Sequence, residues 1–272
     1  MGKDTKLSME NSVKIMGIIN LNEDSYFAAS RVPDPGGALA RIEKQLEDGA
    51  DIIDLGACST RPGSIPIDEK TEWQRLKPLL IQLRDRFPNT CFSIDTFRSG
   101  IVERCFDTIG PFWINDISAG EDDSKMLSLA GRLELPFVAM HKRGNPSTMQ
   151  GLCHYQDLLG ELIHYFQEFD IKSQYTGIAH WVLDPGFGFA KTTEQNLELL
   201  HRLDELQVLQ REILVGISRK SFIYKPLGLQ PEDVLEQTSA YHQIALQKGA
   251  SILRVHDVAP AKALLNKKNI DN

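Results

Sequence analysis

The sequence predicts a (β/α)₈ barrel, in which eight parallel strands alternate with helices and the active site lies at the carboxyl ends of the strands. Three observations support this fold class. Apolar runs alternate with amphipathic stretches along all 272 residues, the apolar runs are almost continuous, and the length suits one barrel. Continuous apolar runs are typical of parallel strands that are buried on both faces. An open, doubly wound sheet is the alternative, because one sequence does not reveal the order of its strands.

Eight runs have the pattern of buried strands, and helix-like stretches separate them. The strand-like runs are residues 13–20, 51–57, 91–97, 113–119, 136–141, 180–187, 212–218 and 251–257. Clear helix-like stretches are residues 37–50, 68–87 and 231–250. Because no stretch has the composition of a linker, we expect a polar extension over residues 1–12 and a single barrel domain over residues 13–272.

The bulk composition argues against several classes of protein. The net charge of −7 gives no general attraction to nucleic acid or to an anionic membrane, so an anionic ligand needs local cations. No apolar run approaches the roughly 20 residues of a membrane span, and the polar amino terminus has no signal-peptide core. Cys58, Cys91, Cys105 and Cys153 lack metal-ligand spacing. We therefore expect a cytoplasmic protein with reduced cysteines and with neither a nucleic-acid nor a membrane partner.

Polar residues close each of the eight strand-like runs. The carboxyl ends of barrel strands meet at one rim, so these side chains should face a common space. Buried acids and amides are costly without partners, and a ring of them indicates either mutual pairing or a polar ligand. In chain order the closing residues are Asn20, the segment STRPGS (59–64), Asp95 and Thr96, Asn115 and Asp116, Met140 and His141, Asp184, the segment SRKS (218–221), and Arg254, His256 and Asp257.

These polar residues form two chemical sets. The carboxylates and amide of the first set suit a ligand edge that is rich in N–H donors. The cations and donors of the second set suit phosphate or carboxylate. A ligand with a heterocyclic donor edge and an anionic tail would satisfy both sets, whereas the alternative is a network of internal Asp–Arg and Asp–Lys pairs. The first set is Asp95, Asn115 and Asp184, and the second is Arg61, Lys220, Arg254 and His256.

The chain resembles the dihydropteroate synthases, folate-pathway enzymes of the pterin-binding (β/α)₈ group. The resemblance extends from MGIIN at residues 16–20 to RVHDV at residues 254–258. Between these ends the motifs are DLGACSTRPGS, FSIDTFR, INDISAG, MHKRGNPSTMQ, LDPGFGFAKT and GISRKSF, in this order. The resemblance implies that the enzyme joins 6-hydroxymethyl-7,8-dihydropterin pyrophosphate to p-aminobenzoate. Pyrophosphate would leave first, with the help of Mg²⁺, and 7,8-dihydropteroate would form.

The resemblance also implies the residues of three sub-sites. Catalysis would involve Asp95, Lys220, Arg254 and His256. The pterin would contact Asp95, Asn115, Met140, Asp184 and Lys220. The pyrophosphate would contact Asn20, Arg61, Arg254 and His256, with Asn20 also beside Mg²⁺, and the aminobenzoate would contact Thr60, Pro62, Phe189 and Ser221. A homodimer and sensitivity of the family to sulfonamides belong to the same expectation.

One segment departs from the family, and three further functions compete with this one. The family usually continues after the first strand with Val-Thr-Pro-Asp-Ser-Phe, but here Asn22 and Glu23 replace the Thr-Pro pair, which makes this loop more flexible. Corrinoid-dependent methyltransferases share the fold and bind a pterin without pyrophosphate. The second and third competing functions are a catalytically silent pterin-binding module and a phosphate-binding aldolase with Lys220 as its Schiff-base lysine. The motifs STRPG, SRKS and RVHD together favour the synthase.

Overall fold

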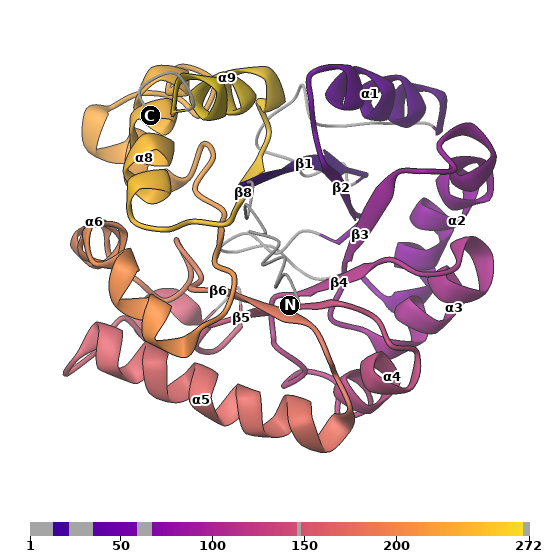
Figure 1. Ribbon diagram of the computed structural model, residues 1–272, viewed down its shortest axis with the longest axis horizontal. Coiled ribbons are helices and arrows are strands. Elements are labelled where there is room, and N and C mark those ends of the chain that lie inside the picture. The colour runs from indigo at the N-terminus through magenta and orange to yellow at the C-terminus, as the bar shows by residue number, and fades with distance from the viewer. Residues whose placement is uncertain (1–12, 22–34, 59–66, 146–147, 269–272) are drawn as a thin grey trace, which may run out of the picture.

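The chain forms a barrel of eight parallel strands with helices around it (Figure 1). The computed structural model describes residues 13–21, 35–58, 67–145 and 148–268. The predicted extension over residues 1–12 lies outside this part of the chain and stays a prediction. The strands are β1 (Lys14–Asn20), β2 (Ile52–Gly56), β3 (Cys91–Asp95), β4 (Trp113–Asp116), β5 (Phe137–Met140), β6 (Trp181–Asp184), β7 (Leu214–Val215) and β8 (Ile252–Val255).

The strand order confirms the predicted barrel and excludes the doubly wound sheet. Hydrogen-bonded neighbours follow the order β6-β5-β4-β3-β2-β1-β8-β7, so strands that are consecutive in sequence are also neighbours in space. A parallel bridge between Leu183 and Ile213 joins the β6 side to the segment before β7, where Leu183 N donates to Glu212 O at 3.0 Å. β7 is only two residues long, much shorter than the predicted run of residues 212–218.

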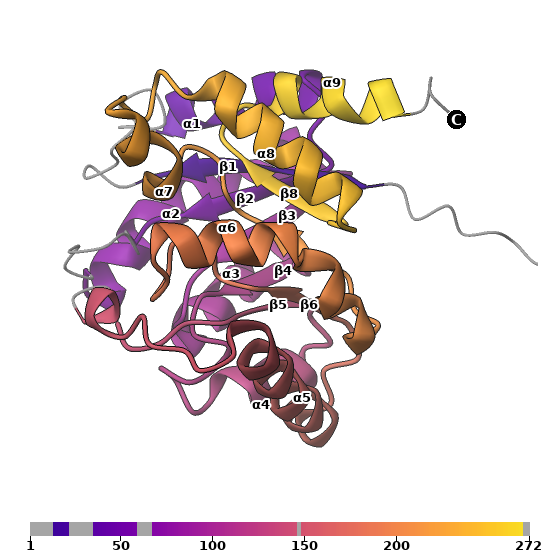
Figure 2. The same cartoon turned by 90° about the vertical axis from the view of Figure 1, so that its left-hand side faces the viewer.

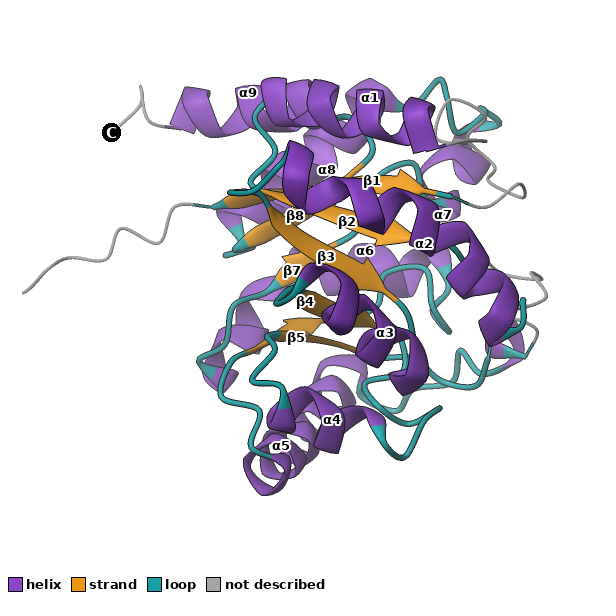
Figure 3. Cartoon of the chain, turned by 90° about the vertical axis from the view of Figure 1, so that its right-hand side faces the viewer, coloured by secondary structure: helices purple, strands orange, loops and turns teal. Residues whose placement is uncertain are grey.

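Helices cover the outside of the barrel, as Figure 3 shows for α1, α2 and α3 beside β1, β2 and β3. Side-chain caps fix two of their starts: Asp68 accepts from Thr71 N at 2.7 Å before α2, and Thr192 and Gln195 form a reciprocal capping box before α6. The helices are α1 (Pro35–Glu47), α2 (Glu69–Arg86), α3 (Ser99–Ile109), α4 (Met126–Arg132), α5 (Leu158–Thr176), α6 (Thr193–His201), α7 (Ser221–Tyr224), α8 (Leu235–Gln247) and α9 (Val258–Lys268), with 3₁₀ turns η2 (Met149–Gly151), η3 (Leu203–Leu209) and η4 (Lys225–Leu227).

An apolar plug closes the interior of the barrel near the amino-terminal ends of the strands. Its members come from almost every strand and are buried against one another, apart from the larger core between strands and helices. Since side chains on a strand alternate between faces, the residues two and four positions further along also face the interior. The plug consists of Met16, Ile52, Trp113, Val138, Val182, Leu214 and Ile252.

A polar layer lies directly above this plug. Asp54 follows the plug residue Ile52 by two positions, and Asn115, Asp184 and Arg254 follow Trp113, Val182 and Ile252 in the same way. The alternation of the strands therefore carries these polar side chains into the barrel interior at the carboxyl ends. Figure 2 shows β1, β2, β3 and β8 from the side, between α1, α8 and α9 above and α6 below. Among the described residues, no helix is both long and apolar enough to span a membrane.

Candidate active site

The strand register brings three predicted residues to one level of the barrel. Asn20 of β1 is in register with Gly56 of β2, and Gly56 is in register with Asp95 of β3. Asp95 is in register with Asn115 of β4. A Cβ atom at Gly56 would lie 3.5 Å from Asp95 Oδ2 and 3.7 Å from Asn20 Oδ1, so both oxygens flank this glycine. The missing side chain leaves space between an amide and a carboxylate that come from different strands.

The opposite side of the barrel supplies further predicted residues. Met140 and Asp184 are in register across β5 and β6, and both side chains are buried. His256 follows β8, where its backbone N–H donates to Ser218 Oγ at 3.2 Å, and Ser221 begins α7. The structure thus places these residues around the rim in the predicted order. Thr60, Arg61 and Pro62 lie outside the described residues, as do Asn22 and Glu23.

A buried ion-pair network forms the floor of the site. Arg254 Nη2 lies 2.6 Å from Asp54 Oδ2 and 2.7 Å from Asp95 Oδ2, and Arg254 Nε donates to Asp54 Oδ2 at 2.7 Å. Asn115 Nδ2 donates to the same Asp54 oxygen at 3.2 Å. The expectation of internal Asp–Arg pairs is therefore correct for Arg254. Asp54 was not among the predicted site residues, although an acid inside the apolar run IIDLG is an unusual signal.

Burial shifts the protonation of this network. Desolvation raises the pKa of Asp95 to about 7, against the attraction of Arg254. Burial also opposes the charge of Arg254, but Asp54 and Asp95 together raise the pKa of its guanidinium above the ordinary value. We conclude that Arg254 stays protonated, and that the carboxyl group of Asp95 can change its charge near neutral pH.

Asp184 and Lys220 both line the site, and they influence each other through charge rather than through a hydrogen bond. Asp184 Oδ1 accepts a hydrogen bond from Gly186 N at 2.8 Å, and burial raises the pKa of its carboxyl group although Lys220 opposes the shift. Lys220 Nζ donates to Phe187 O and lies 4.9 Å from the centroid of the Phe189 ring. Desolvation lowers the pKa of this half-buried ammonium to about 8. Within the described part of the chain, these two residues do not form the Asp–Lys pair that the sequence allowed.

The segment after β6 forms one wall of the site. A tight turn at Gly186 gives this wall its shape, and a second lysine, Lys191, stabilises the turn. Gly186 has φ +71°, and a Cβ atom there would lie 2.0 Å from His141 O, so only glycine fits. Lys191 Nζ donates to Gly186 O at 3.1 Å and to Phe189 O at 3.3 Å, and it lies 3.2 Å from His141 Nδ1. Burial lowers the pKa of Lys191 to about 7, and that of His141 falls below its ordinary range. Lys191 was not predicted, because in the sequence it looks like an ordinary helix-start lysine.

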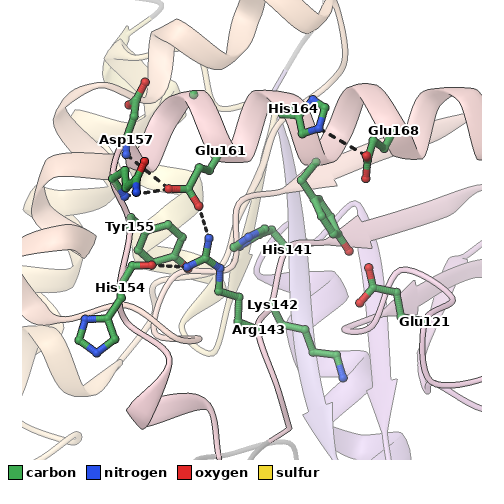
Figure 4. Close-up of a pocket in the computed structure, with 13 residues that line it drawn as sticks. Glu121, His141, Lys142, Arg143, His154, Tyr155, Asp157, Glu161, His164 and Glu168 are labelled. Atoms are coloured by element: carbon green, nitrogen blue, oxygen red, sulfur yellow. Dashed lines mark hydrogen bonds and ion pairs between the residues drawn. The ribbon is translucent and has the colours of Figure 1, made fainter.

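A pocket of about 830 Å³ lies beside this wall, between the segment after β5 and helix α5 (Figure 4). It shares His141 with the site but is otherwise separate from the floor network. Its charged side chains are largely paired with each other: Arg143 pairs with Glu161, and His164 lies 3.4 Å from Glu168. Arg143 also lies 3.8 Å from the centroid of the Tyr155 ring. The candidate active site is instead the floor network, because three predicted residues, Asp95, Asn115 and Arg254, meet there.

Acids, amides and cations converge inside the mouth of this eight-stranded barrel, which is where α/β-barrel enzymes have their active sites. The family described as pterin binding enzyme matches residues 16–256, a range that includes every predicted site residue. The chain therefore belongs to the pterin-binding enzymes.

Individual relatives show which kind of pterin-binding enzyme this chain is similar to. A dihydropteroate synthase of Synechocystis is 39% identical over 247 residues, which cover 90% of this chain and 85% of the relative. The structure of Yersinia pestis dihydropteroate synthase with a sulfonamide drug complex superposes with a TM-score of 0.91 at 32% identity, over 98% of this chain and 97% of that one. The Thermus thermophilus enzyme in complex with 4-aminobenzoate gives a TM-score of 0.84 at 35% identity, over 95% and 94%.

Within the pterin-binding enzymes, the chain is one of the dihydropteroate synthases, and it is a transferase of folate biosynthesis. This confirms the family that the sequence motifs indicated. The corrinoid methyltransferase, the silent binding module and the aldolase gain no support from these relatives.

Lys191 generates a prediction about stability and pH. The unfolded chain holds the Lys191 proton up to its ordinary pKa of 10.5, whereas the folded chain releases it near 7. The free energy of unfolding of the wild type, relative to that of Lys191→Met, should therefore rise as the pH increases from about 7 to about 10. Urea denaturation at several pH values measures this difference. Lys172→Met, which removes an exposed lysine of α5, is the control, and a pH-independent difference for Lys191→Met would contradict the argument.

Proposed function

We propose that the pterin ring binds over the floor network with its 2-amino-pyrimidinone edge toward Asp184, Asn115 and Asp95. The observation that carries this proposal is the convergence of three buried acceptor side chains from β3, β4 and β6 above a closed apolar plug. Carboxylates and an amide oxygen complement the N–H donors of such an edge. The Phe189 ring and the Lys220 ammonium, 4.9 Å apart, supply a flat wall and a donor beside it.

The chemistry that suits this site is dissociative. The bond between the exocyclic carbon and the pyrophosphate oxygen breaks, and its electron pair leaves with pyrophosphate. The carbon that remains is cationic and is stabilised by the nearby Asp95 and Asp184 carboxylates. The aniline nitrogen of p-aminobenzoate then forms the new C–N bond and loses one proton. Lys220 and His256 stand at the rim, where they can contact the anionic leaving group.

Mg²⁺ fits this site as a companion of the pyrophosphate. Mg²⁺ keeps several waters and takes only one or two protein oxygens together with phosphate oxygens. Asn20 Oδ1, which flanks Gly56 at the end of β1, is such an oxygen. Among the described residues no group of three acidic, histidine or cysteine side chains forms a complete metal site, in keeping with a cation that arrives with its substrate. When bound, Mg²⁺ would neutralise negative charge on the pyrophosphate.

A homodimer and a cytoplasmic location complete the proposal. The four cysteines carry no disulfides, and Cys58 and Cys105 are buried, which suits a reducing compartment. The homodimer rests on the resemblance to the family alone. Sedimentation of the purified protein tests it, and a monomer at micromolar concentration would contradict it.

Release of pyrophosphate tests the function directly. We expect release from the dihydropterin pyrophosphate to depend on p-aminobenzoate and to match the formation of 7,8-dihydropteroate in a one-to-one ratio. A coupled phosphate assay together with chromatography of the product measures both quantities. Pterin binding without any pyrophosphate release would instead indicate a silent binding module.

Asp184→Asn should weaken pterin binding without affecting pyrophosphate. Gly186 N already donates to Oδ1, so the amide keeps this acceptor and places an NH₂ group where the second carboxylate oxygen meets the ligand. An unsatisfied buried donor costs about 1–3 kcal/mol, which corresponds to roughly ten- to hundredfold in affinity. Calorimetry with 6-hydroxymethyl-7,8-dihydropterin and with pyrophosphate measures the two affinities. Equal losses for both ligands, together with a lower melting temperature, would assign Asp184 a structural role instead.

Asn20→Ala tests the proposed Mg²⁺ contact. We expect the variant to bind pyrophosphate in the presence of Mg²⁺ about three- to thirtyfold more weakly than the wild type, since one oxygen ligand is lost. Without Mg²⁺ the two proteins should bind pyrophosphate almost equally. Calorimetry with and without the metal makes the comparison independent of catalysis. A loss of the same size under both conditions would mean that Asn20 contacts pyrophosphate directly and holds no metal.

A further inference from the structure

Asp54 lies beneath the proposed pterin site, where it is completely buried. It stands in the middle of β2, two residues above the plug residue Ile52 and two below Gly56. Its contacts with described side chains go to two residues of the proposed site. One oxygen, Oδ2, accepts hydrogen bonds from Arg254 and from Asn115. Asp54 can therefore influence a bound ligand only indirectly, through the orientation of Arg254 and Asn115.

The negative charge of Asp54 decides which way the Asn115 amide points. An amide can rotate to exchange its oxygen and nitrogen, and only its partners select one orientation. With Nδ2 3.2 Å from the Asp54 carboxylate, the bond is favourable, whereas the rotated amide would place an oxygen against an anion. The geometry of the amide then directs Oδ1 away from Asp54. Asn115 thus turns its Oδ1 acceptor toward its other neighbours, and only the second N–H of its amide remains as a donor.

Asp54 also fixes the plane of the Arg254 guanidinium. Nε and Nη2 both contact Asp54 Oδ2, at 2.7 and 2.6 Å, and Nη2 additionally contacts Asp95. Two nitrogens held by acids from β2 and β3 leave the planar group little freedom to turn. Nη1 is the guanidinium nitrogen without a hydrogen bond to the described residues. The side chain is about one-fifth exposed, so the group still borders the site.

We propose that Asp54 is a positioning residue of the pterin site, which selects the acceptor face of Asn115 and holds Arg254 beside Asp95. The proposal deepens the proposed function, on which it rests. According to this proposal, Asp54 is the reason why the site prefers a ring edge that carries N–H donors. A neutral residue at this position would leave the Asn115 amide free to present its NH₂ group, which repels the same edge.

Asp54→Asn is the first test, because it keeps the size of the side chain and removes the charge. We expect the affinity for 6-hydroxymethyl-7,8-dihydropterin to fall about ten- to hundredfold. The KM for the pterin pyrophosphate should rise accordingly, while the KM for p-aminobenzoate should stay within about threefold. Calorimetry and steady-state kinetics measure these quantities.

Asp116→Asn is the matched control. Asp116 is another completely buried acid, at the end of β4, but its oxygens accept from Ser118 and from Gly120 N instead of from site residues. We expect this variant to change the melting temperature and to leave the pterin affinity within about threefold of the wild type. If both variants lose the same pterin affinity, Asp54 has only a structural role and the proposal is wrong.

A double-mutant cycle with Asn115→Ala shows whether Asp54 acts through the amide. Without the Asn115 side chain, Asp54→Asn should reduce the pterin affinity several-fold less than it does in the wild-type background. The loss that remains would be the effect of Asp54 on Arg254. Strictly multiplicative losses would contradict the proposal.

The wild-type protein provides a second measurement that does not depend on how Asp54→Asn folds. The side-chain NH₂ resonances of Asn115, identified by their loss in Asn115→Ala, should exchange slowly with solvent before any pterin is added. Exchange as fast as that of an exposed asparagine would overturn the proposal. If the amide is protected but the wild type does not bind pterin, the proposed function fails while the contact with Asp54 stands.

Discussion

One guanidinium shared by two carboxylates holds the site together. Moving an arginine out of water costs several kcal/mol, and a buried acid carries a similar penalty. Arg254, Asp54 and Asp95 come from three different strands and offset these penalties for each other. If Arg254 were neutral or absent, two acids on adjacent strands would repel each other inside the barrel. The arrangement of the whole polar layer therefore depends on this one cation.

The apolar plug below makes that interaction strong. Met16, Ile52 and Val182 are buried members of this plug, which separates the polar layer from the amino-terminal end of the barrel. In such surroundings charges interact through a low effective dielectric, and each ionisable group is drawn toward its neutral form. The raised pKa of Asp95 and the lowered pKa of Lys220 have this common cause. Along each strand, the desolvated floor of the site and the more exposed rim are therefore only a few residues apart.

The sequence predicts the fold and three of the four floor residues, but it does not predict Asp54 or the wall residue Lys191. Asp95, Asn115 and Asp184 were identifiable because each closes an apolar run, and the period of the strands fixes where such residues point. Asp54 lies inside its run, and its partner Arg254 is 200 residues away, so no local pattern relates them. Lys191 was missed for a similar reason, since its partners are carbonyls of a turn and His141, which follows β5 about 50 residues earlier in the chain. The length of β7 depends on closure of the barrel, which a local run cannot specify.

Lys191 and Lys220 show that two lysines near the site can have different roles. Lys191 uses its donors on Gly186, Phe189 and His141, so it shapes the wall. Lys220 contacts Phe187 O and otherwise stands over the Phe189 ring, nearer the open side. In the proposed reaction pyrophosphate leaves first and the aniline nitrogen then loses a proton, so the charge within the site changes twice. Groups whose pKa values lie near neutrality adjust to such changes at low cost, because either protonation state is accessible. Asp95 and Lys220 satisfy this condition because desolvation raises the pKa of Asp95 to about 7 and lowers that of Lys220 to about 8.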